Sequence, residues 1–330
     1  MRCIYCMVDK VYSDDSKVSE FNREHVLQQS MGVFTGQVLV LRCVCTACNT
    51  AFSKGLDLAL GRDSFESFNR TWHGLQPASD FQGRGLKSVT KFESTDSTIN
   101  GAMLRPIPLE ERGKFALAVH PHVRFESQGD PGNIIEVRAN EIPTPEELMR
   151  KGFTLPIAIQ IRGDGIERTR EELRAKGWSV QDTGESGVHP GRIVAGEAVF
   201  SLTPELLRAV SKTAFNFYAA VCGADAARES LCDALRNYIY VGKEPERLPI
   251  KTIEPCAISA HPRCHWIAIA NVRGQMLVEV CFFAERCYRV LVREDSEINS
   301  VNGCYVFDLD TTSVTQYSHV PSRMQRGFER

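Results

Sequence analysis

The amino-acid sequence predicts an α+β protein in two parts, and three observations support this expectation. Two Cys-x-x-Cys pairs within the first 48 residues are typical of a small metal-stapled module. A long amphipathic helix is expected from Thr203, and a second helix follows it. Short apolar runs then predict antiparallel strands. We therefore expect an N-terminal module over residues 1–75 and a larger α+β domain over residues 76–330, with a helix pair and a C-terminal β-meander.

The paired cysteines predict a structural zinc site. Cys3 and Cys6 form one pair, Cys45 and Cys48 form the other, and four thiolates complete the tetrahedron that structural Zn²⁺ prefers. The pairs are 38 residues apart, more than the roughly 15–20 of a simple zinc ribbon. A further element is therefore expected between them. Cys43 is a spare thiol two residues before Cys45, and a swap between these two is left open.

Three polar residues near the cysteines predict a second, catalytic metal site. Glu24 and His25 lie between the two pairs, and Asn49 follows the last cysteine directly. A carboxylate and an amide offer the oxygen ligands that Mg²⁺ and Mn²⁺ take, and a near-neutral imidazole suits a general base. The competing interpretation is a zinc module without catalysis, in which Glu24 and His25 lie on an ordinary strand and Asn49 caps a helix.

These residues resemble the zinc-knuckle branch of the HNH endonucleases. The similarity covers about residues 1–60. It lies in Cys3-Ile-Tyr-Cys6, Glu24-His25, Cys45-Thr-Ala-Cys48-Asn49 and Phe52-Ser-Lys54-Gly55. The zinc-bearing phage junction resolvases show the same order of acidic residue, histidine and Cys-x-x-Cys-Asn. The resemblance implies the ββα-metal (His-Me finger) fold, in which two strands and a helix clasp one divalent ion.

The resemblance also implies roles for single residues. His25 would take a proton from the attacking water, while Glu24 and Asn49 would hold a catalytic Mg²⁺ or Mn²⁺. The ion would stabilise the leaving 3′-oxygen and the pentavalent phosphorane. Neighbouring residues of a regular strand point to opposite sides, and the family brings the acidic residue to the metal through a bend.

One position departs from the family pattern. Members often carry an asparagine just before the second strand, in a stretch where Gln37 is the nearest amide here. Its side chain offers the same donor and acceptor one methylene further out. Lys54 is a candidate phosphate contact, against the simpler interpretation of a solvated helix lysine.

The segment after residue 200 contains the clearest helix signal. Thr203 is expected to cap the helix, Pro204 to occupy its first turn and Gly223 to end it. Apolar residues on one face predict a core helix, with Lys212 on or near the polar side. The elements expected next are a helix over residues 225–238, a hairpin of strands 266–272 and 276–283, and a strand over 288–292.

Composition sets broad limits. The chain has 330 residues, 43% of them hydrophobic and 24% charged, as in an ordinary globular protein. No apolar run approaches the ~20 residues of a membrane-spanning helix, and no signal-peptide core follows Met1. The twelve cysteines fit reduced thiols plus zinc better than disulfides. We therefore expect a cytoplasmic protein that does not enter a membrane.

Net charge says little about partners. The formal value is −2, whereas a nucleic-acid binder needs only a local positive surface. Arg84 and Lys87, in a glycine-bearing stretch after the module, are the preferred candidates for phosphate contact beside Lys54.

The sequence as a whole predicts a metal-dependent HNH-type endonuclease. It would hydrolyse phosphodiester bonds, prefer DNA over RNA and leave a 5′-phosphate and a 3′-hydroxyl. By association, such proteins often act in bacterial restriction or antiphage defence. The second part would then sense an activating ligand or partner, and cutting both strands of a duplex would favour a homodimer. The competing class is a zinc-stapled module that binds nucleic acid or protein without cutting.

Overall fold

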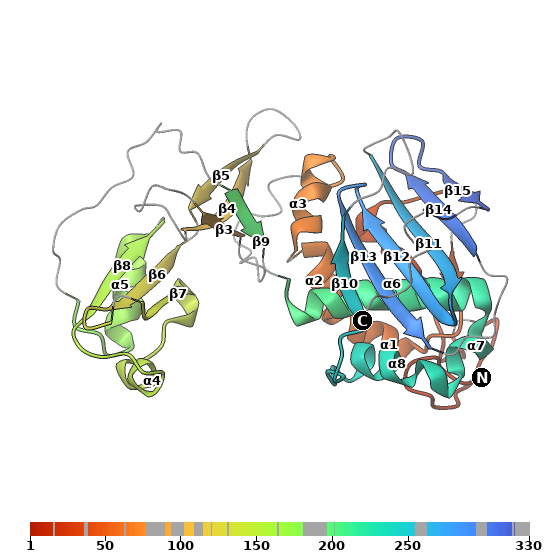
Figure 1. The fold of residues 1–330 in the computed structure, drawn as a ribbon, viewed down its shortest axis with the longest axis horizontal. Coiled ribbons are helices and arrows are strands. Elements are labelled where there is room, and N and C mark those ends of the chain that lie inside the picture. The colour runs from red at the N-terminus through yellow and green to blue at the C-terminus, as the bar shows by residue number, and fades with distance from the viewer. Residues whose placement is uncertain are drawn as a thin grey trace. The chain divides into compact units, whose positions relative to one another are not determined.

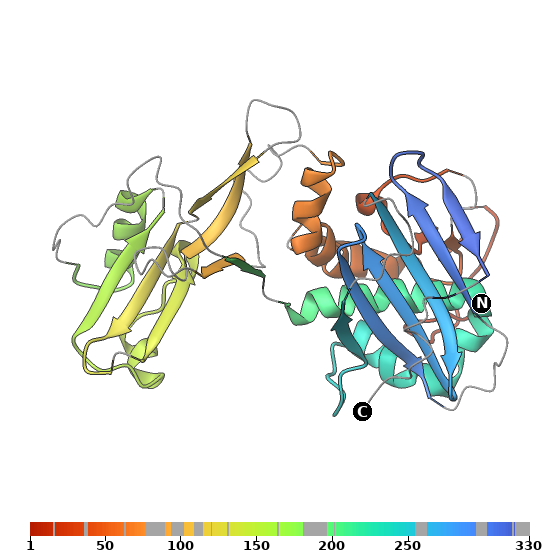
Figure 2. The same cartoon turned by 45° about the horizontal axis from the view of Figure 1, so that its top comes forward.

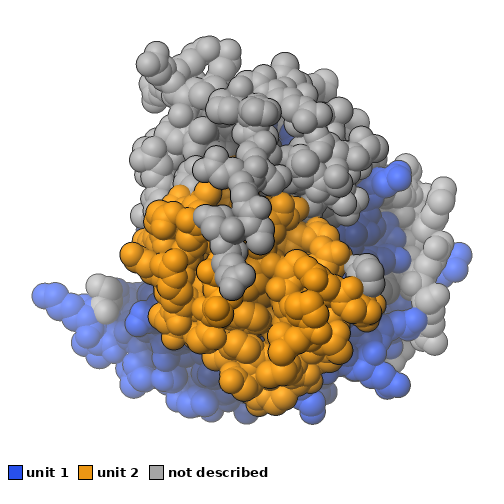
Figure 3. Space-filling model, turned by 90° about the vertical axis from the view of Figure 1, so that its left-hand side faces the viewer, with its two compact units in different colours: residues 1–76, 202–330 blue, residues 77–201 orange. Residues whose placement is uncertain are grey.

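The first 76 residues fold together with the last third of the chain. In the computed structural model, red and orange N-terminal elements lie among the teal and blue elements of the C-terminal third (Figure 1), and a turned view agrees (Figure 2). Residues Met1–Gln76 and Leu202–Arg330 form unit 1, and Pro77–Ser201 form unit 2 (Figure 3). This differs from the expected consecutive domains 1–75 and 76–330. The reason is a hydrophobic core that the N-terminal module shares with residues after 201.

The structure describes most of the chain. The described residues are 1–15, 17–35, 39–62, 64–76, 90–93, 102–108, 115–119, 121–130, 132–163, 165–180, 197–200, 202–254, 263–294, 302–318 and 320. Among them, no helix is long and apolar enough to cross a membrane.

Unit 1 is a mixture of helices and strands. Its helices are η1 (Gln29–Met31), α1 (Thr46–Lys54), α2 (Leu56–Arg62), α3 (Phe65–Trp72), α6 (Pro204–Cys222), α7 (Ala224–Arg228), η4 (Ser230–Cys232) and α8 (Asp233–Tyr240). Its strands are β1 (Glu24–His25), β2 (Val40–Leu41), β10 (Ile250–Ile253), β11 (Cys264–Val272), β12 (Gln275–Phe282), β13 (Arg286–Arg293), β14 (Asn302–Asp308) and β15 (Val314–Tyr317).

A six-stranded antiparallel sheet forms the body of unit 1, in the order β10-β13-β12-β11-β14-β15. The predicted meander is confirmed as β11-β12-β13, because β11 pairs with β12 and β12 with β13. Arg273 and Gly274 turn the first hairpin with φ of 54° and 81°, the left-handed region that a tight hairpin turn requires.

Helix α6 packs across one face of this sheet against β11, β12 and β13. Its ends are as predicted: Thr203 Oγ1 accepts a hydrogen bond from Leu206 N at 3.2 Å, Pro204 occupies the first turn, and Gly223 follows the last residue. Its burial exceeds the prediction, since Lys212 is only 1% exposed instead of lying on a polar face. The next expected helix is interrupted and forms α7, η4 and α8.

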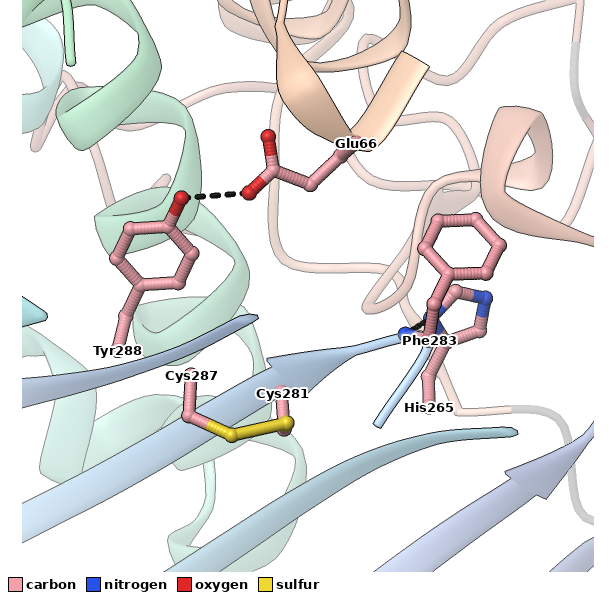
Figure 4. Close-up of a disulfide and its surroundings, with 6 residues drawn as sticks. All are labelled: Glu66, His265, Cys281, Phe283, Cys287 and Tyr288. Atoms are coloured by element: carbon pink, nitrogen blue, oxygen red, sulfur yellow. Dashed lines mark hydrogen bonds between the residues drawn. A yellow bond between two sulfur atoms is a disulfide. The ribbon is translucent and has the colours of Figure 1, made fainter. Parts of the chain in front are cut away.

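A disulfide joins the neighbouring strands β12 and β13. Cys281 and Cys287 lie opposite each other in the register and are bonded (Figure 4). At these two positions the structure corrects the expectation of reduced thiols, whereas nine other described cysteines are free, including the four of the predicted zinc cluster. Nearby, Tyr288 donates a hydrogen bond to Glu66 of α3, and Phe283 N donates one to His265 Nδ1 (Figure 4).

Unit 2 has a hydrophobic core of its own. Two antiparallel sheets, β5-β4-β3-β9 and β7-β6-β8, are described there. Its strands are β3 (Thr90–Glu93), β4 (Ala102–Pro108), β5 (Phe115–Val119), β6 (His122–Ser127), β7 (Ile134–Arg138), β8 (Ile157–Arg162) and β9 (Glu197–Phe200). Its helices are η3 (Ala139–Glu141), α4 (Pro145–Arg150) and α5 (Ile166–Ala175). Phe125 and Trp178 are among the residues at the centre of this core.

Candidate metal centre and nuclease site

The four cysteines of the two pairs lie together. The Sγ atoms of Cys3, Cys6, Cys45 and Cys48 are all within 4.8 Å of one another, and three of the four residues are buried. Cys43 is buried but is not part of the cluster, so the paired spacing selects Cys45. A group of four cysteines that could hold a metal ion is therefore present where the sequence predicts it.

The cluster has dimensions that fit zinc. Sγ–Sγ distances are 3.9 Å between Cys3 and Cys48 and 3.8 Å between Cys6 and Cys45. Tetrahedral Zn²⁺ with Zn–S bonds of about 2.3 Å requires sulfur atoms about 3.8 Å apart. The backbone N–H groups of Tyr5 and Cys45 also point at Cys3 Sγ, at 3.5 and 3.3 Å. Such donors stabilise thiolate charge and orient the ligand.

Residues after position 201 hold the first cysteine pair in place. Arg236 of α8, which is 3% exposed, donates from Nε to Ile4 O at 2.8 Å, between the two cysteines of the pair. Tyr5 OH donates to Asn216 Oδ1 of α6 at 2.7 Å. The metal cluster is thus built into the core of unit 1.

Two strands and a helix follow the first cysteine pair. In the β1–β2 hairpin, Glu24 pairs with Leu41 and His25 with Val40. Helix α1 begins directly after Cys45. Asn49 of α1 donates from Nδ2 to Asn22 Oδ1 at 2.8 Å and to Arg23 O at 3.2 Å. Its amide therefore reaches the residues that lead into β1.

His25 is partly exposed and lies beside a small pocket. Its Nε2 is 3.2 Å from Gln29 Nε2, and the pocket offers about 30 Å³ of space for water. The pocket is lined by His25, Leu27, Gln29, Gly32, Val33, Phe34, Leu39 and Phe307. Burial, with a smaller contribution from Arg23, lowers the pKa of His25, so the imidazole is neutral at pH 7 as a general base must be.

Glu24 turns to the opposite side and is buried, with 4% of its surface exposed. Its Oε1 lies 2.7 Å from Lys212 Nζ and accepts a hydrogen bond from Asn216 Nδ2 at 3.0 Å. Burial raises the pKa of Glu24, and the Lys212 ammonium acts against that rise. Burial would lower the pKa of Lys212, but Glu24 and Asp57 outweigh it and raise that pKa, so the lysine is charged.

Asp57 of α2 completes the surroundings of Lys212. Lys212 Nζ donates to Asp57 Oδ1 at 2.7 Å, and Gln28 Nε2 donates to the same oxygen at 2.8 Å. The ammonium is therefore shared by two carboxylates, one next to His25 in sequence and one on the helix that follows α1.

Glu24, the expected carboxylate ligand of the divalent ion, has one of its two oxygens committed to other groups. Its Oε1 is engaged by a buried cation and an amide, and a second cation at that oxygen would be repelled by Lys212. Asn49 fits better, because both of its hydrogen bonds use the amide nitrogen and leave its oxygen uncommitted to them. Within the described residues, the four cysteines are the only group of three or more His, Cys, Asp or Glu side chains that could hold an ion.

The remaining predicted contacts stay predictions. Lys54, the last residue of α1, is exposed to solvent. Arg84, Lys87 and Gln37 lie outside the described residues.

Lys212 and Asn216 are the site residues that sequence reasoning missed. Each is 1% exposed, and together they form an i, i+4 pair on a helix whose neighbouring residues are also buried. The sequence did contain a signal for them: the apolar residues of α6 are not confined to one face, which indicates a helix that is buried on most sides. A lysine and an amide on such a helix need buried partners.

No protein-family model, curated protein or solved structure matches the chain.

Proposed function

We propose that unit 1 is an HNH-type endonuclease in which His25 is the general base. The observation that carries the proposal is the order of elements on the cysteine cluster: a hairpin bearing His25, then a helix whose Asn49 reaches the start of the same strand. The substrate would be a nucleic-acid phosphodiester, with DNA preferred over RNA, and a role in restriction or antiphage defence is the expected setting.

His25 has the properties that proton abstraction needs. The imidazole is neutral at pH 7, is partly exposed, and borders a pocket large enough for a water molecule. It would accept a proton from water as that water attacks phosphorus. Gln29 Nε2 is a donor 3.2 Å from His25 Nε2, so the amide would have to move aside before this ring nitrogen could accept the proton from water.

A requirement for Mg²⁺ or Mn²⁺ is part of the proposal as a prediction. Such an ion would supply charge stabilisation at the phosphate. The proton transfer assigned to His25 uses only its own ring nitrogen, so it does not depend on which groups hold the ion.

The proposal is tested by digestion of supercoiled plasmid with Mg²⁺, Mn²⁺ or EDTA. We expect metal-dependent nicking by the wild type, at least about a hundredfold less nicking by His25→Ala, and a marked loss in Asn49→Ala. Thr50→Ala is the matched control, since Thr50 is an exposed neighbour on α1. Equal nicking by wild type and His25→Ala would contradict the proposal.

A second candidate is a zinc-stapled binding module that does not cut, and the engagement of Glu24 with Lys212 favours it. This module would retain one Zn²⁺ and shift duplex or single-stranded DNA in a gel without any need for a further divalent ion. Binding without cleavage under every metal condition would select this candidate over the nuclease.

A further inference from the structure

We propose that Glu24 is a positioning residue reserved for Lys212 and Asn216, so that helix α6, encoded after unit 2, forms part of the scaffold of the nuclease site. This inference rests on the proposed function and differs from the simpler expectation that Glu24 ligates the catalytic ion. Three sets of contacts support it.

The first support is a continuous chain of hydrogen bonds from the cysteine cluster to the His25 strand. Tyr5, in the first cysteine pair, donates to Asn216, and Asn216 donates to Glu24 at 3.0 Å. The members of this chain are 1–4% exposed, so water does not compete for these bonds. A fully satisfied buried network specifies one arrangement of its elements.

The second support is the charge balance at Lys212. Its ammonium lies 2.7 Å from Glu24 Oε1 and 2.7 Å from Asp57 Oδ1. Removing one partner of a buried ion pair leaves an uncompensated charge, which is strongly destabilising. Moving Glu24 toward a metal ion would therefore take from the buried Lys212 one of these two carboxylates.

The third support is the direction of the two side chains of β1. Glu24 faces α6, whereas His25 lines the pocket on the other side, as alternation along a strand requires. Fixing Glu24 to α6 consequently fixes the side to which His25 points. Phe307 of β14, also after residue 201, contributes to the wall of the same pocket.

The test separates positioning from metal binding with full-length, zinc-loaded variants. Glu24→Gln keeps the oxygen that accepts from Asn216 but removes the charge that Lys212 needs. Lys212→Met removes the ammonium without touching an expected metal ligand. Glu205→Gln, at an exposed position of α6, is the matched control. Asn216→Ala is measured alongside, because it removes hydrogen bonds while leaving both charges in place, and keeps the test decisive if Lys212→Met fails to fold.

Two readouts are measured on each variant: nicking rate, and Mn²⁺ affinity by electron paramagnetic resonance. We expect Glu24→Gln, Lys212→Met and Asn216→Ala each to cut at least about tenfold more slowly, while Mn²⁺ affinity stays within about twofold of the wild type. The double variant Glu24→Gln/Lys212→Met should recover part of the lost rate, because neither position 24 nor position 212 then carries a buried charge, and Asp57, which loses the ammonium, is partly exposed and still accepts from Gln28. General misfolding of the site would lower Mn²⁺ affinity together with the nicking rate. The expected pattern, a slower rate with unchanged Mn²⁺ affinity and partial recovery in the double variant, is therefore specific to positioning.

Opposite results would overturn the inference. A loss of Mn²⁺ affinity of about tenfold or more in Glu24→Gln alone would make Glu24 a ligand. Full activity in Lys212→Met would show that the ion pair does not position the site. Failure of the proposed function gives a different pattern: a wild type that neither cuts nor binds Mn²⁺. In that case the unfolding free energies of the same single and double variants test the contact alone. Non-additive effects of the substitutions at residues 24 and 212 would support the structural role of this ion pair, and additive effects would refute it.

Discussion

At the scale of single residues, His265 shows how the N-terminal module is joined to the sheet. Phe283 N donates to its Nδ1 at 3.1 Å, which leaves the ring proton on Nε2 to donate to Met31 O at 2.8 Å. Met31 belongs to η1, in the loop that leads from β1 to β2. Burial lowers the pKa of His265 to about 3, so the ring is neutral in the folded protein.

This residue predicts a pH dependence of stability. An unfolded histidine titrates near pH 6.5, whereas folded His265 titrates near 3, so the unfolded chain binds the proton first as pH falls. The stabilisation is complete above about pH 6.5, declines as pH falls toward 3, and is on the order of 5 kcal/mol. His265→Gln should be less stable at pH 7.5, by about 1–3 kcal/mol for a lost buried hydrogen bond, but should lose less stability on acidification.

Urea unfolding of both proteins between pH 7.5 and 5 measures this difference. Protonation of the zinc ligands affects the wild type and the variant alike, so the comparison of slopes isolates His265. Parallel stability curves for the two proteins would show that the histidine does not contribute in this way.

Single residues also show what the sequence could and could not reveal. The cysteine set was predictable, because the x-x spacing alone brings each pair to one ion and repeats in the second pair. The environment of Lys212 was not, since its partners Glu24 and Asp57 are 188 and 155 residues away along the chain. No local pattern records contacts between residues so far apart.

At the scale of elements, prediction succeeded where the ends of an element have a local cause. Helix α6 begins and ends where Thr203, Pro204 and Gly223 indicate, and the β11–β12 hairpin turns at Arg273-Gly274. The helix after Gly223 was less predictable. It divides into α7, η4 and α8, and Arg236 of α8 donates to the carbonyls of Ile4 and Ala227, so tertiary contacts shape it.

The cap of α6 provides a prediction at this scale. Thr203→Ala removes the acceptor for Leu206 N and should lower the free energy of unfolding by about 1 kcal/mol. Thr203→Ser retains a capping hydroxyl and should stay within a few tenths of a kcal/mol of the wild type. Chemical denaturation at neutral pH distinguishes the two. Equal destabilisation by alanine and serine would mean that the hydroxyl does not cap the helix.

At the scale of the whole molecule, the segment that forms unit 2 is inserted between the two segments of the chain that form unit 1, and each unit has its own hydrophobic core. The core of unit 1 contains Cys3, Cys45 and Cys48 together with residues of α6 and the six-stranded sheet. The core of unit 2 is a separate cluster that includes Phe125 and Trp178. Sequence patterns placed a boundary near residue 75, but the return of the chain to the first unit depends on packing that only the folded structure records.

The two cores predict that the units respond independently to damage. Cys45→Ser should lose zinc and destabilise unit 1, because metal binding in such sites is part of the folding free energy. Cys43→Ser, the matched control, should keep about one zinc per chain, since Cys43 lies outside the cluster. Trp178→Ala should instead destabilise unit 2 by about 3–5 kcal/mol, the usual cost of emptying a buried aromatic site. Its indole, which donates to Pro143 O at 2.7 Å, fills that core.

Calorimetry of the full chain, with zinc content measured in parallel, follows both units at once. We expect Cys45→Ser to lower the melting transition of unit 1 and leave that of unit 2 in place, and Trp178→Ala to do the reverse. Because the metal cluster, α6 and Val26, the residue after β1, share one core, loss of zinc should also abolish any nicking that depends on His25, whereas Trp178→Ala should leave zinc content unchanged. A single transition that moves equally in both variants would mean that the units unfold as one, and the stability of the candidate nuclease site would then depend on unit 2 as well.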